Sequence, residues 1–258
     1  METIELLKNR MSLRKYKNTP IKKEHLDIIL NSAMRAPTAG NMMLYSIIVI
    51  EDQEKKNILS KSCDNQPFIA NAPIVLIFLA DMQRWFDYYN YCSVKEYCSL
   101  KNMDYNAPDE GDLMLALADA VIAAQNAVVA AEALNIGSCY IGDIIENYEI
   151  HKDLLNLPKW VFPAAMLCLG YYPEEQKKII SPRFDKEYIV FKENYKRLNN
   201  DDFKDMFIER EKRLSPENKA QAVNYGQFMY ARKTGTEFSK EMTRSVREML
   251  KNWGGEKL

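Results

Sequence analysis

The stretch GDLMLALADAVIAAQNAVVAAEALNIG, residues 111–137, decides how this chain can fold. Alanine, leucine and valine dominate it, and the pattern predicts one long helix that Gly137 closes. Its few polar side chains are Asp119, Gln125, Asn126 and Glu132. A helix that is apolar around most of its circumference must be covered, either by a large core or by another subunit.

Short apolar segments before and after this helix have the composition of β-strands. They are rich in β-branched or aromatic residues, are bounded by turn residues or charges, and occupy residues 44–52, 73–81, 162–172 and 188–192. The segment 73–81 is apolar on both faces, which is typical of a strand in the middle of a sheet.

Further helices are predicted around these strands. Residues 21–36 carry apolar side chains at helical spacing until Pro37 ends the pattern. The highly charged residues from about 199 onward, including 237–253, also have a helical pattern. Strands alternate with helices, but the strands are too few for a doubly wound parallel sheet. The sequence therefore predicts an α+β sandwich with helices on both sheet faces, built as a single domain from residues 1–258.

The composition argues against several classes of protein. A hydrophobic content of 47% can supply a sizeable core. The chain has 35 basic and 36 acidic residues, so no net field attracts nucleic acid or an anionic membrane. The longest uncharged apolar run, residues 72–80, is far shorter than the ~20 residues of a membrane helix. The first residues carry acids and lack the apolar core of a signal peptide, so we expect a cytoplasmic protein.

Cysteine and histidine usage agrees with that expectation. The five cysteines include no Cys-x-x-Cys pair, and an odd number fits a reduced chain better than a disulfide framework. With His25 and His151 as the only imidazoles, no metal site is predicted. Cys139 and His151 could form a nucleophile pair, but a core cysteine is the better interpretation because no further residue supports the pair.

Arg10, Ser12 and Arg14, in the stretch RMSLRKY, are the first candidates for a binding site. In an extended segment all three project from one face, and in a helix the two arginines are neighbours. Either backbone brings two guanidinium groups close to one hydroxyl, a combination that suits a phosphate. The alternative is a solvated basic helix end, where cations interact favourably with the helix dipole.

Two weaker candidates lie further along the chain. Arg183, in SPRF, follows a loop where a sheet could present it to a ligand, although a surface arginine is the simpler interpretation. In GSCYIGD, residues 137–143, Gly142 could let backbone amides approach a planar ligand, or the segment could be an ordinary helix-to-strand turn. The sequence has no GxGxxG, P-loop, GxSxG or HExxH motif. A phosphate site without side-chain catalysts suggests a cofactor that carries its own chemistry.

These signals, in this order, resemble one family. The chain is similar to the FMN-dependent nitroreductases, in particular to the branch of oxygen-insensitive NADPH nitroreductases and NADPH–flavin oxidoreductases. The resemblance runs from about residue 3 to 250 and rests on the segments IELLKNRMSLRKYKNTPI, RAPTAGNMMLYSIIVI, AQNAVVAAEALNIGSCYIGDI, FPAAMLCLGYYPEEQ with SPRF, and YARKTGTEFSKEMTRSVREML. It implies a three-layer α/β/α sandwich with a mixed, mostly antiparallel central sheet in an intertwined homodimer, in which the helical extension 199–258 wraps the partner subunit.

The resemblance also implies a role for each candidate residue. The residues expected to bind FMN are Arg10, Ser12 and Arg14 at the phosphate and ribityl chain, Arg183 with Ser181 at the phosphate, Gln66 at the flavin ring, Tyr140, Ile141, Gly142 and Asp143 in the loop beneath the ring, and Thr38, Ala39 and Gly40 in a loop that reaches the FMN of the partner subunit. Ser181 stands where the family often has a lysine, and Asp143 where it often has a second glycine.

The same resemblance implies where the nucleotide substrate binds. Arg232 and Lys233 are expected near the nucleotide, where arginines of the NADPH-using branch engage the 2′-phosphate. Glu237 replaces the second arginine of that branch, and a carboxylate repels a phosphate. The sequence therefore predicts weaker selectivity for NADPH than that branch shows.

The implied function is ping-pong hydride transfer by an FMN-dependent NAD(P)H oxidoreductase. NADH or NADPH would reduce FMN, and a nitroaromatic, a quinone or a related small acceptor would then take the electrons. No side chain is expected to be an obligatory catalyst. Three alternatives stay open: a flavin reductase that supplies free reduced flavin, a dehalogenase-like FMN enzyme whose lid the segment 199–230 could form, and a non-catalytic flavin-binding module.

Overall fold

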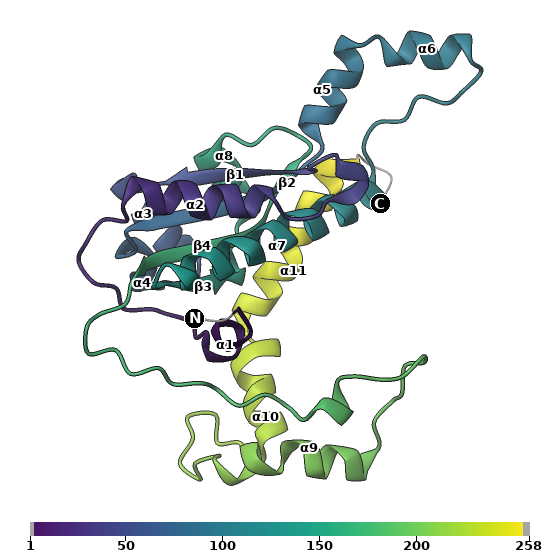
Figure 1. The fold of residues 1–258 in the computed structure, drawn as a ribbon. Helices are drawn as coiled ribbons and strands as arrows, with labels where there is room; N and C mark the ends of the chain where they lie inside the picture. The colour runs from purple at the N-terminus through teal and green to yellow at the C-terminus, as the bar shows by residue number, and fades with distance from the viewer. Residues whose placement is uncertain (1–2, 255–258) are drawn as a thin grey trace. The chain divides into compact units, whose positions relative to one another are not determined.

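The computed structural model describes residues 3–254 (Figure 1), and the chain divides into two compact units. One unit comprises the residues up to Ile179 together with those from Glu241 on, and the other comprises Ile180–Lys240. The first unit contains the β-sheet and the helices that cover it. Helix α11 (Glu237–Gly254) begins in the second unit and continues in the first.

The first unit is built around a four-stranded antiparallel sheet with the strand order β1–β2–β4–β3. The strands are β1 (Tyr45–Ile50), β2 (Ile74–Asp81), β3 (Ile136–Ile141) and β4 (Val161–Tyr171). Every residue of β2 is buried, which confirms the prediction of a central strand. Its alternate side chains point to opposite faces, so Leu76 enters one core cluster and Val75 the other.

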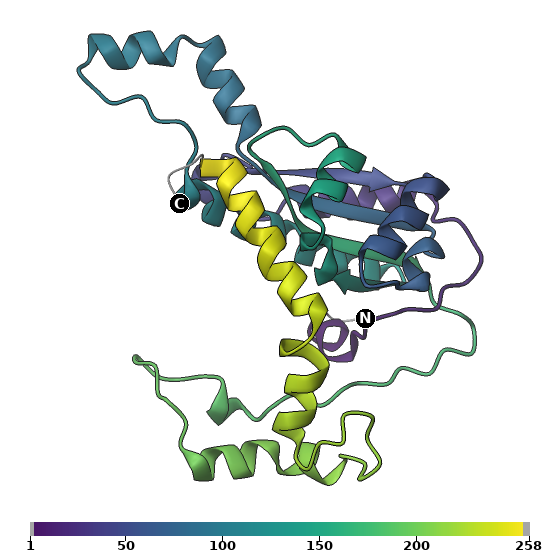
Figure 2. The same ribbon diagram turned by 180° about the vertical axis from the view of Figure 1, so that it is seen from behind.

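Helices cover both faces of this sheet, as the sequence predicts. On one face lie α2 (Lys23–Met34) and α7 (Glu110–Ala133), and on the other, nearer the viewer in Figure 2, lie α3 (Gln53–Ser62), α4 (Pro67–Ala70) and α8 (Tyr148–Leu155). A third cluster joins Leu113 of α7 to Met249 and Trp253 of α11. The predicted three-layer α/β/α sandwich is therefore confirmed.

Smaller elements complete the first unit. They are the helices α1 (Thr3–Asn9), α5 (Gln83–Tyr91) and α6 (Val94–Leu100) and the 3₁₀ turns η1 (Ala39–Asn41) and η2 (Gly142–Ile145). Helices α5 and α6 extend away from the sheet (Figure 1). They expose large apolar side chains, among them Tyr91 and Leu100.

Helix α7 has a buried side and an exposed apolar side. Its length and composition are those of a membrane-crossing helix, but 44% of its most apolar window is buried within the protein. Its acidic residues Asp119 and Glu132 are buried and accept hydrogen bonds from protein groups. Its apolar composition is thus explained in large part by packing on the sheet and on α2. The apolar side chains that it leaves exposed are Met114, Leu115, Val121 and Ile122.

The end of α7 differs from the prediction. The helix ends at Ala133 and Gly137 does not close it, because Gly137 lies inside strand β3. Asn135 adopts the left-handed φ of 57° that the helix end was expected to obtain from glycine. The segment interpreted as a possible turn, 137–143, is mostly the edge strand β3 followed by η2.

The second unit is helical and contains no strand within residues 180–240. It is formed by η3 (Lys186–Tyr188), α9 (Asn200–Lys212), α10 (Tyr225–Met229), the π-helical turn η4 (Tyr230–Thr234) and the start of α11. The guanidinium carbon of Arg210 lies 3.6 Å from the centre of the Phe184 ring, which links the loop before η3 to α9.

The strand predicted at 188–192 is wrong. After Tyr188 the chain turns, and the amides of Ile189 and Val190 donate to the carbonyl of Lys186. Because these amides are satisfied locally, apolar composition does not make this segment a strand. The helix predicted over 237–253 is confirmed by α11, and the helical stretch predicted from about 199 is confirmed in part, because α9 and α10 are helical but residues 213–224 are not.

Candidate functional site

The segment that carries the predicted phosphate residues is extended. Ser12 forms a parallel bridge with Ser138 of the edge strand β3, and the amide of Leu13 donates to the Ser138 carbonyl at 2.9 Å. Leu13 is buried, whereas Ser12 and Arg14 are exposed. Because side chains alternate along an extended chain, Arg10, Ser12 and Arg14 share the face opposite Leu13. The structure therefore selects the extended alternative over the helical one.

A pair of glycines makes room for this segment. Gly137 of β3 and Gly170 of β4 stand opposite each other in the sheet register. A Cβ on Gly137 would lie 2.7 Å from the Cβ of Leu13, and one on Gly170 would lie 2.9 Å from the Cβ of Tyr16. The sequence pattern predicts Gly137 at a helix end and gives Gly170 no role. A glycine inside an apolar strand segment often marks a place where another backbone segment packs closely, and this pattern could have indicated the contact.

The Gly137→Ala variant should be less stable than the wild type by about 1–3 kcal/mol, because the new methyl group overlaps the fixed Cβ of Leu13. Urea denaturation measures this difference. The matched control is Gly111→Ala, in α7, where nothing lies within 4 Å of the added carbon and stability should stay equal or rise. Equal stability of the Gly137→Ala variant and the wild type would show that the N-terminal segment does not pack on β3.

The two arginines of this segment have no carboxylate partner. Within residues 3–254 neither Arg10 nor Arg14 forms an ion pair, and the Arg14 guanidinium lies 5.7 Å from the centre of the Phe68 ring. Burial raises the pKa of the Cys139 thiol, and Arg14, Ser12 and Arg10 all act in the opposite direction, which places the three around this side chain. Two unneutralised guanidiniums beside a hydroxyl suit a phosphate dianion.

Gln66 and Asp143 are joined directly, although 77 residues separate them in the sequence. Gln66 lies at the start of α4, and its Nε2 donates to Asp143 Oδ2 at 3.0 Å and to the carbonyl of Cys63 at 3.0 Å. Asp143 lies in η2, directly after β3. Phe68, which faces Arg14, is two residues beyond Gln66. The structure thus brings the predicted ring contacts Gln66 and Asp143 to the same edge of the sheet as the predicted phosphate contact Arg14.

The residues that lead into η2 differ in exposure. Ile141 is buried, whereas Tyr140 is 37% exposed and its hydroxyl donates to Gln125 of α7 at 3.4 Å. Burial raises the pKa of Tyr140 to about 12, against the opposing charge of Arg10. Nothing lies within 4 Å of the position that a Cβ would take on Gly142. This free space beside the backbone fits the predicted close approach of a planar ligand.

The loop at 38–40 lies elsewhere in the first unit. The amides of Ala39 and Leu44 donate to the two carboxylate oxygens of Asp119 in α7, and Gly40 has a φ of 56°. No hydrogen bond or ion pair among the described residues joins this loop to Gln66 or Asp143. The loop leads into β1, at the opposite edge of the sheet from β3, which carries the predicted ring contacts Tyr140 and Ile141.

The predicted residues of the second unit are mostly exposed. Ser181 and Arg183 lie in the loop before η3. Arg232 lies 5.8 Å from the centre of the Phe228 ring, and Lys233 lies at the same distance from the Phe238 ring. Glu237 accepts a hydrogen bond from Lys240 at 2.6 Å.

The similarity of this chain to known proteins covers the segments described above. The model of the nitroreductase family matches residues 7–171, which include the N-terminal arginines, Gln66, η2 and the whole sheet.

The chain belongs to the nitroreductase family.

Relatives extend this likeness beyond the matched residues. Two proteins of Bacillus subtilis are similar to this chain. The first, an FMN reductase using NAD(P)H, is 31% identical over 201 residues, which cover 78% of this chain and 76% of the relative. The second, an FMN reductase using NADPH, is 32% identical over 216 residues, which cover 83% of this chain and 82% of the relative. The solved structure of NfrA2 from B. megaterium has a TM-score of 0.78 and 27% identity, and the match covers 100% of both chains.

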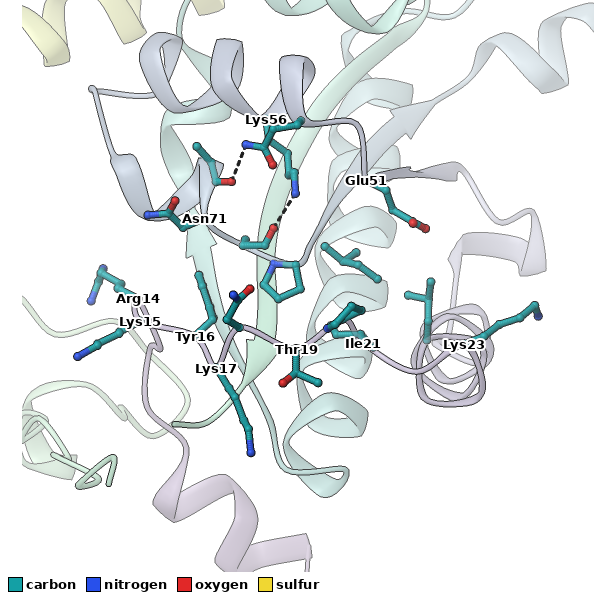
Figure 3. A pocket seen from close by; sticks show the side chains of 18 of the residues that line it. Arg14, Lys15, Tyr16, Lys17, Thr19, Ile21, Lys23, Glu51, Lys56 and Asn71 are labelled. Carbon is teal, nitrogen blue, oxygen red and sulfur yellow. Dashed lines mark hydrogen bonds between the residues drawn. The ribbon is translucent and has the colours of Figure 1, made fainter. Parts of the chain in front are cut away.

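The cavity in Figure 3 is lined by one of the predicted site residues of this nitroreductase. It measures about 1040 Å³ and lies between residues 14–21, the start of α3 and residues 70–74. Lys56 is buried in its wall and donates to the carbonyl of Ala72 at 3.0 Å. Of the predicted site residues in the described chain, Arg14 alone lines it. The other predicted flavin contacts therefore do not line this cavity.

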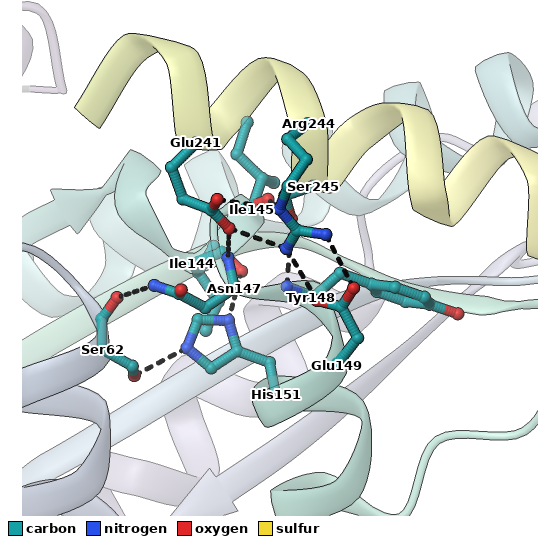
Figure 4. Close-up of polar contacts among 10 residues, drawn as sticks. All are labelled: Ser62, Ile144, Ile145, Asn147, Tyr148, Glu149, His151, Glu241, Arg244 and Ser245. Carbon is teal, nitrogen blue, oxygen red and sulfur yellow. Dashed lines mark hydrogen bonds and ion pairs between the residues drawn. The ribbon is translucent and has the colours of Figure 1, made fainter. Parts of the chain in front are cut away.

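A buried network holds η2 of the nitroreductase in place (Figure 4). His151 of α8 is fully buried, and its Nδ1 donates to the carbonyl of Ile144 at 2.8 Å while its Nε2 accepts from the hydroxyl of Ser62 at 2.7 Å. The acceptor-only carbonyl fixes this tautomer. Ser245 of α11 donates to the carbonyl of Ile145 at 2.7 Å. His151 therefore supports the site loop and does not pair with Cys139, which is a core residue as predicted.

Charged side chains extend this network to the outside. Arg244 of α11 binds Glu149 of α8 through both carboxylate oxygens at 2.8 Å and also binds Glu241 at 2.8 Å. The Arg244 guanidinium lowers the pKa of Glu149 to about 2. The sequence pattern does not reveal His151 and Arg244 as supports of this segment, because the contacts of His151 with Ser62 and of Arg244 with Glu149 join residues that are distant in the sequence.

Proposed function

We propose that this nitroreductase is an FMN-dependent NAD(P)H oxidoreductase that reduces nitroaromatics, quinones or related small acceptors. The observation that carries the proposal is the pair Arg10 and Arg14, which form no ion pair within residues 3–254 and lie with Ser12 between them on one face of the segment beside β3. Such a pair suits a dianion, and the phosphate of FMN is one. The names of the relatives, which are FMN reductases using NAD(P)H or NADPH, support the same cofactor.

The ring end of the cofactor is assigned to Gln66 and the loop 140–143. In this proposal Gln66 hydrogen-bonds the flavin ring, and the backbone at Gly142, beside free space, approaches the ring. FMN, when bound, supplies hydride transfer from NAD(P)H to the acceptor. The chain contributes position and charge: donors directed at a site where negative charge develops stabilise that charge by several kcal/mol. On the family resemblance, Arg183 and Ser181 contact the phosphate.

The proposal includes a homodimer. Helix α7 exposes Met114, Leu115, Val121 and Ile122, and a contiguous apolar surface of this kind is typical of a subunit contact. The loop 38–40 lies apart from the other predicted contacts in one chain, which agrees with its assignment to the FMN of the partner subunit. The helical extension 199–258 would wrap that partner, although residues 255–258 lie outside the described chain.

Both nucleotides are proposed as substrates. Arg232 and Lys233 offer positive charge to the nucleotide, whereas the carboxylate of Glu237, which accepts from Lys240, stands where a second arginine would favour a 2′-phosphate. The two Bacillus subtilis relatives differ in the same respect, since one is named for NAD(P)H and the other for NADPH. A flavin reductase that releases reduced flavin is the second candidate, because both relatives carry the name FMN reductase.

The purified protein should be yellow or become yellow with FMN, and anaerobic NADH and NADPH should each bleach the bound flavin. The two rates should differ less than 100-fold, because the carboxylate of Glu237 repels the 2′-phosphate of NADPH.

Product analysis with free FMN and with nitrofurazone distinguishes a flavin reductase from a nitroaromatic reductase. Sedimentation of the homodimer should give twice the chain mass of 30.0 kDa. A protein that stays colourless with FMN contradicts the proposal. Bound flavin that neither nucleotide bleaches indicates a non-catalytic flavin-binding protein.

A further inference from the structure

Glu146 is a buried acid that lies close in sequence to the predicted ring contact Asp143. It follows η2, its amide donates to the carbonyl of Asp143 at 3.0 Å, and its side chain is 5% exposed. The Oε1 atom of Glu146 has no hydrogen-bond partner among the described residues. An ionised carboxylate in this position would lack compensation for its lost hydration.

Within residues 3–254 Glu146 forms no ion pair, and the charged groups that raise its pKa are acids. The acids are Asp143 in η2, Asp64 in the turn before α4 and Glu241 in α11. Cys63 and His151 are the neutral neighbours: burial raises the pKa of the thiol and lowers the pKa of the imidazole. The nearby cation, Arg244, is bound by Glu149 and Glu241.

Burial and these acids keep a proton on Glu146. Burial first, and then the charge of Asp143 and a hydrogen bond to it, raise the pKa of Glu146 to about 8. The carboxyl group of Glu146 is therefore protonated at neutral pH. Its neighbour Asp143, three residues earlier, accepts the hydrogen bond from Gln66, so the protonated acid adjoins one of the predicted ring contacts. The family often has glycine at the position of Asp143, so this connection comes from the residues of this chain.

We propose that Glu146 holds a proton for the reaction and passes it through Asp143 to the reduced acceptor at the flavin site. This inference rests on the proposed function. Reduction of a quinone by NAD(P)H consumes one hydride and one proton, because NAD(P)H, quinone and H⁺ give NAD(P)⁺ and hydroquinone. The O–H bond of Glu146 breaks, its proton moves to the carboxylate of Asp143, and Asp143 delivers it to the quinone oxygen. Water then protonates Glu146 again. Glu146 is thus a positioning residue that acts through Asp143.

The first test measures the proton on Glu146 without any flavin. In the ¹³C NMR spectrum of the protein, the carboxyl signal of Glu146, assigned by its absence in Glu146→Gln, should titrate near pH 8. A titration in the ordinary range of glutamate, roughly pH 4–5, would overturn the proposal.

The second test measures the role of that proton in the FMN-loaded protein. Single-turnover oxidation of the bound flavin by a quinone should slow about tenfold between pH 7 and pH 9 in the wild type. Glu146→Gln should already be slow at pH 7 and should change less than about twofold over that range. The matched control is Asp64→Asn, which removes one acid that raises the pKa of Glu146 but leaves Glu146 in place, so a change of about tenfold or more should remain.

The outcomes separate this proposal from the proposed function. A Glu146→Gln profile equal to that of the wild type overturns the role of Glu146 while the oxidoreductase activity stands. A protein that binds no FMN overturns the proposed function, and the role of Glu146 falls with it even if the acid titrates near pH 8.

Discussion

Replacement of both Arg10 and Arg14 by alanine should lower the affinity for FMN at least about 100-fold. Hydrogen bonds to charged groups contribute about 1.5–3 kcal/mol each, and each 1.4 kcal/mol is a factor of ten in affinity. Loss of one such bond from each arginine therefore corresponds to a factor of about 10²–10⁴. The large effect is expected because neither guanidinium is neutralised by a carboxylate within residues 3–254, so the phosphate would be their principal partner.

Equilibrium dialysis with FMN fluorescence as the readout measures this affinity directly. The control variant should remove two positive charges from the same region without touching the proposed contacts, and Lys8→Ala with Lys15→Ala meets that condition because both side chains are exposed. Its affinity should stay within about threefold of the wild type, since exposed charges away from the ligand are screened by salt. If the double arginine variant binds FMN as tightly as this control, the phosphate site lies elsewhere.

The sandwich was predictable because its signals are local. The segment 73–81 is apolar on both faces, and β2 is buried at every position. The long alanine-rich stretch needed a covering surface, and α7 packs on the sheet and α2. The segment 188–192 shows the limit of such patterns, because it has the composition of a strand but no neighbouring strand pairs with it.

The site was predictable in its residues but not in its connections. The face shared by Arg10, Ser12 and Arg14 depends on the bridge to Ser138, and a sequence pattern does not reveal a partner so far along the chain. The sequence shows that Asp143 replaces a residue that is often glycine in the family, but it does not show the hydrogen bond that Asp143 accepts from Gln66. The same limitation applies to buried titratable groups such as Glu146, because their charge depends on neighbours that only the fold assembles.

The His151→Ala variant should lose about 3 kcal/mol or more of stability. His151 is fully buried, and its removal leaves the Ile144 carbonyl without its imidazole donor, while the partly buried Ser62 hydroxyl keeps only the carbonyl of Leu59 at 3.4 Å. Each unsatisfied buried group costs about 1–3 kcal/mol, and the cavity left by the ring adds to this. The control is Asp153→Ala, on the exposed side of α8, which should change stability by less than about 0.5 kcal/mol. FMN affinity should fall together with stability, because Ile144 belongs to η2.

The pH dependence of this loss tests the assigned charge of His151. Burial lowers the pKa of His151 in the folded protein. Below about pH 6.5 the imidazole is therefore protonated in the unfolded chain while it is still neutral in the folded chain. The stabilising contribution of neutral His151 is therefore present above this pH and is lost as the pH falls. The stability difference between wild type and His151→Ala should shrink below pH 6.5 by up to about 1.4 kcal/mol per pH unit. A difference that is constant between pH 5 and pH 8 would mean that the folded imidazole takes up its proton like an ordinary histidine, in which case it cannot accept the hydrogen bond from Ser62.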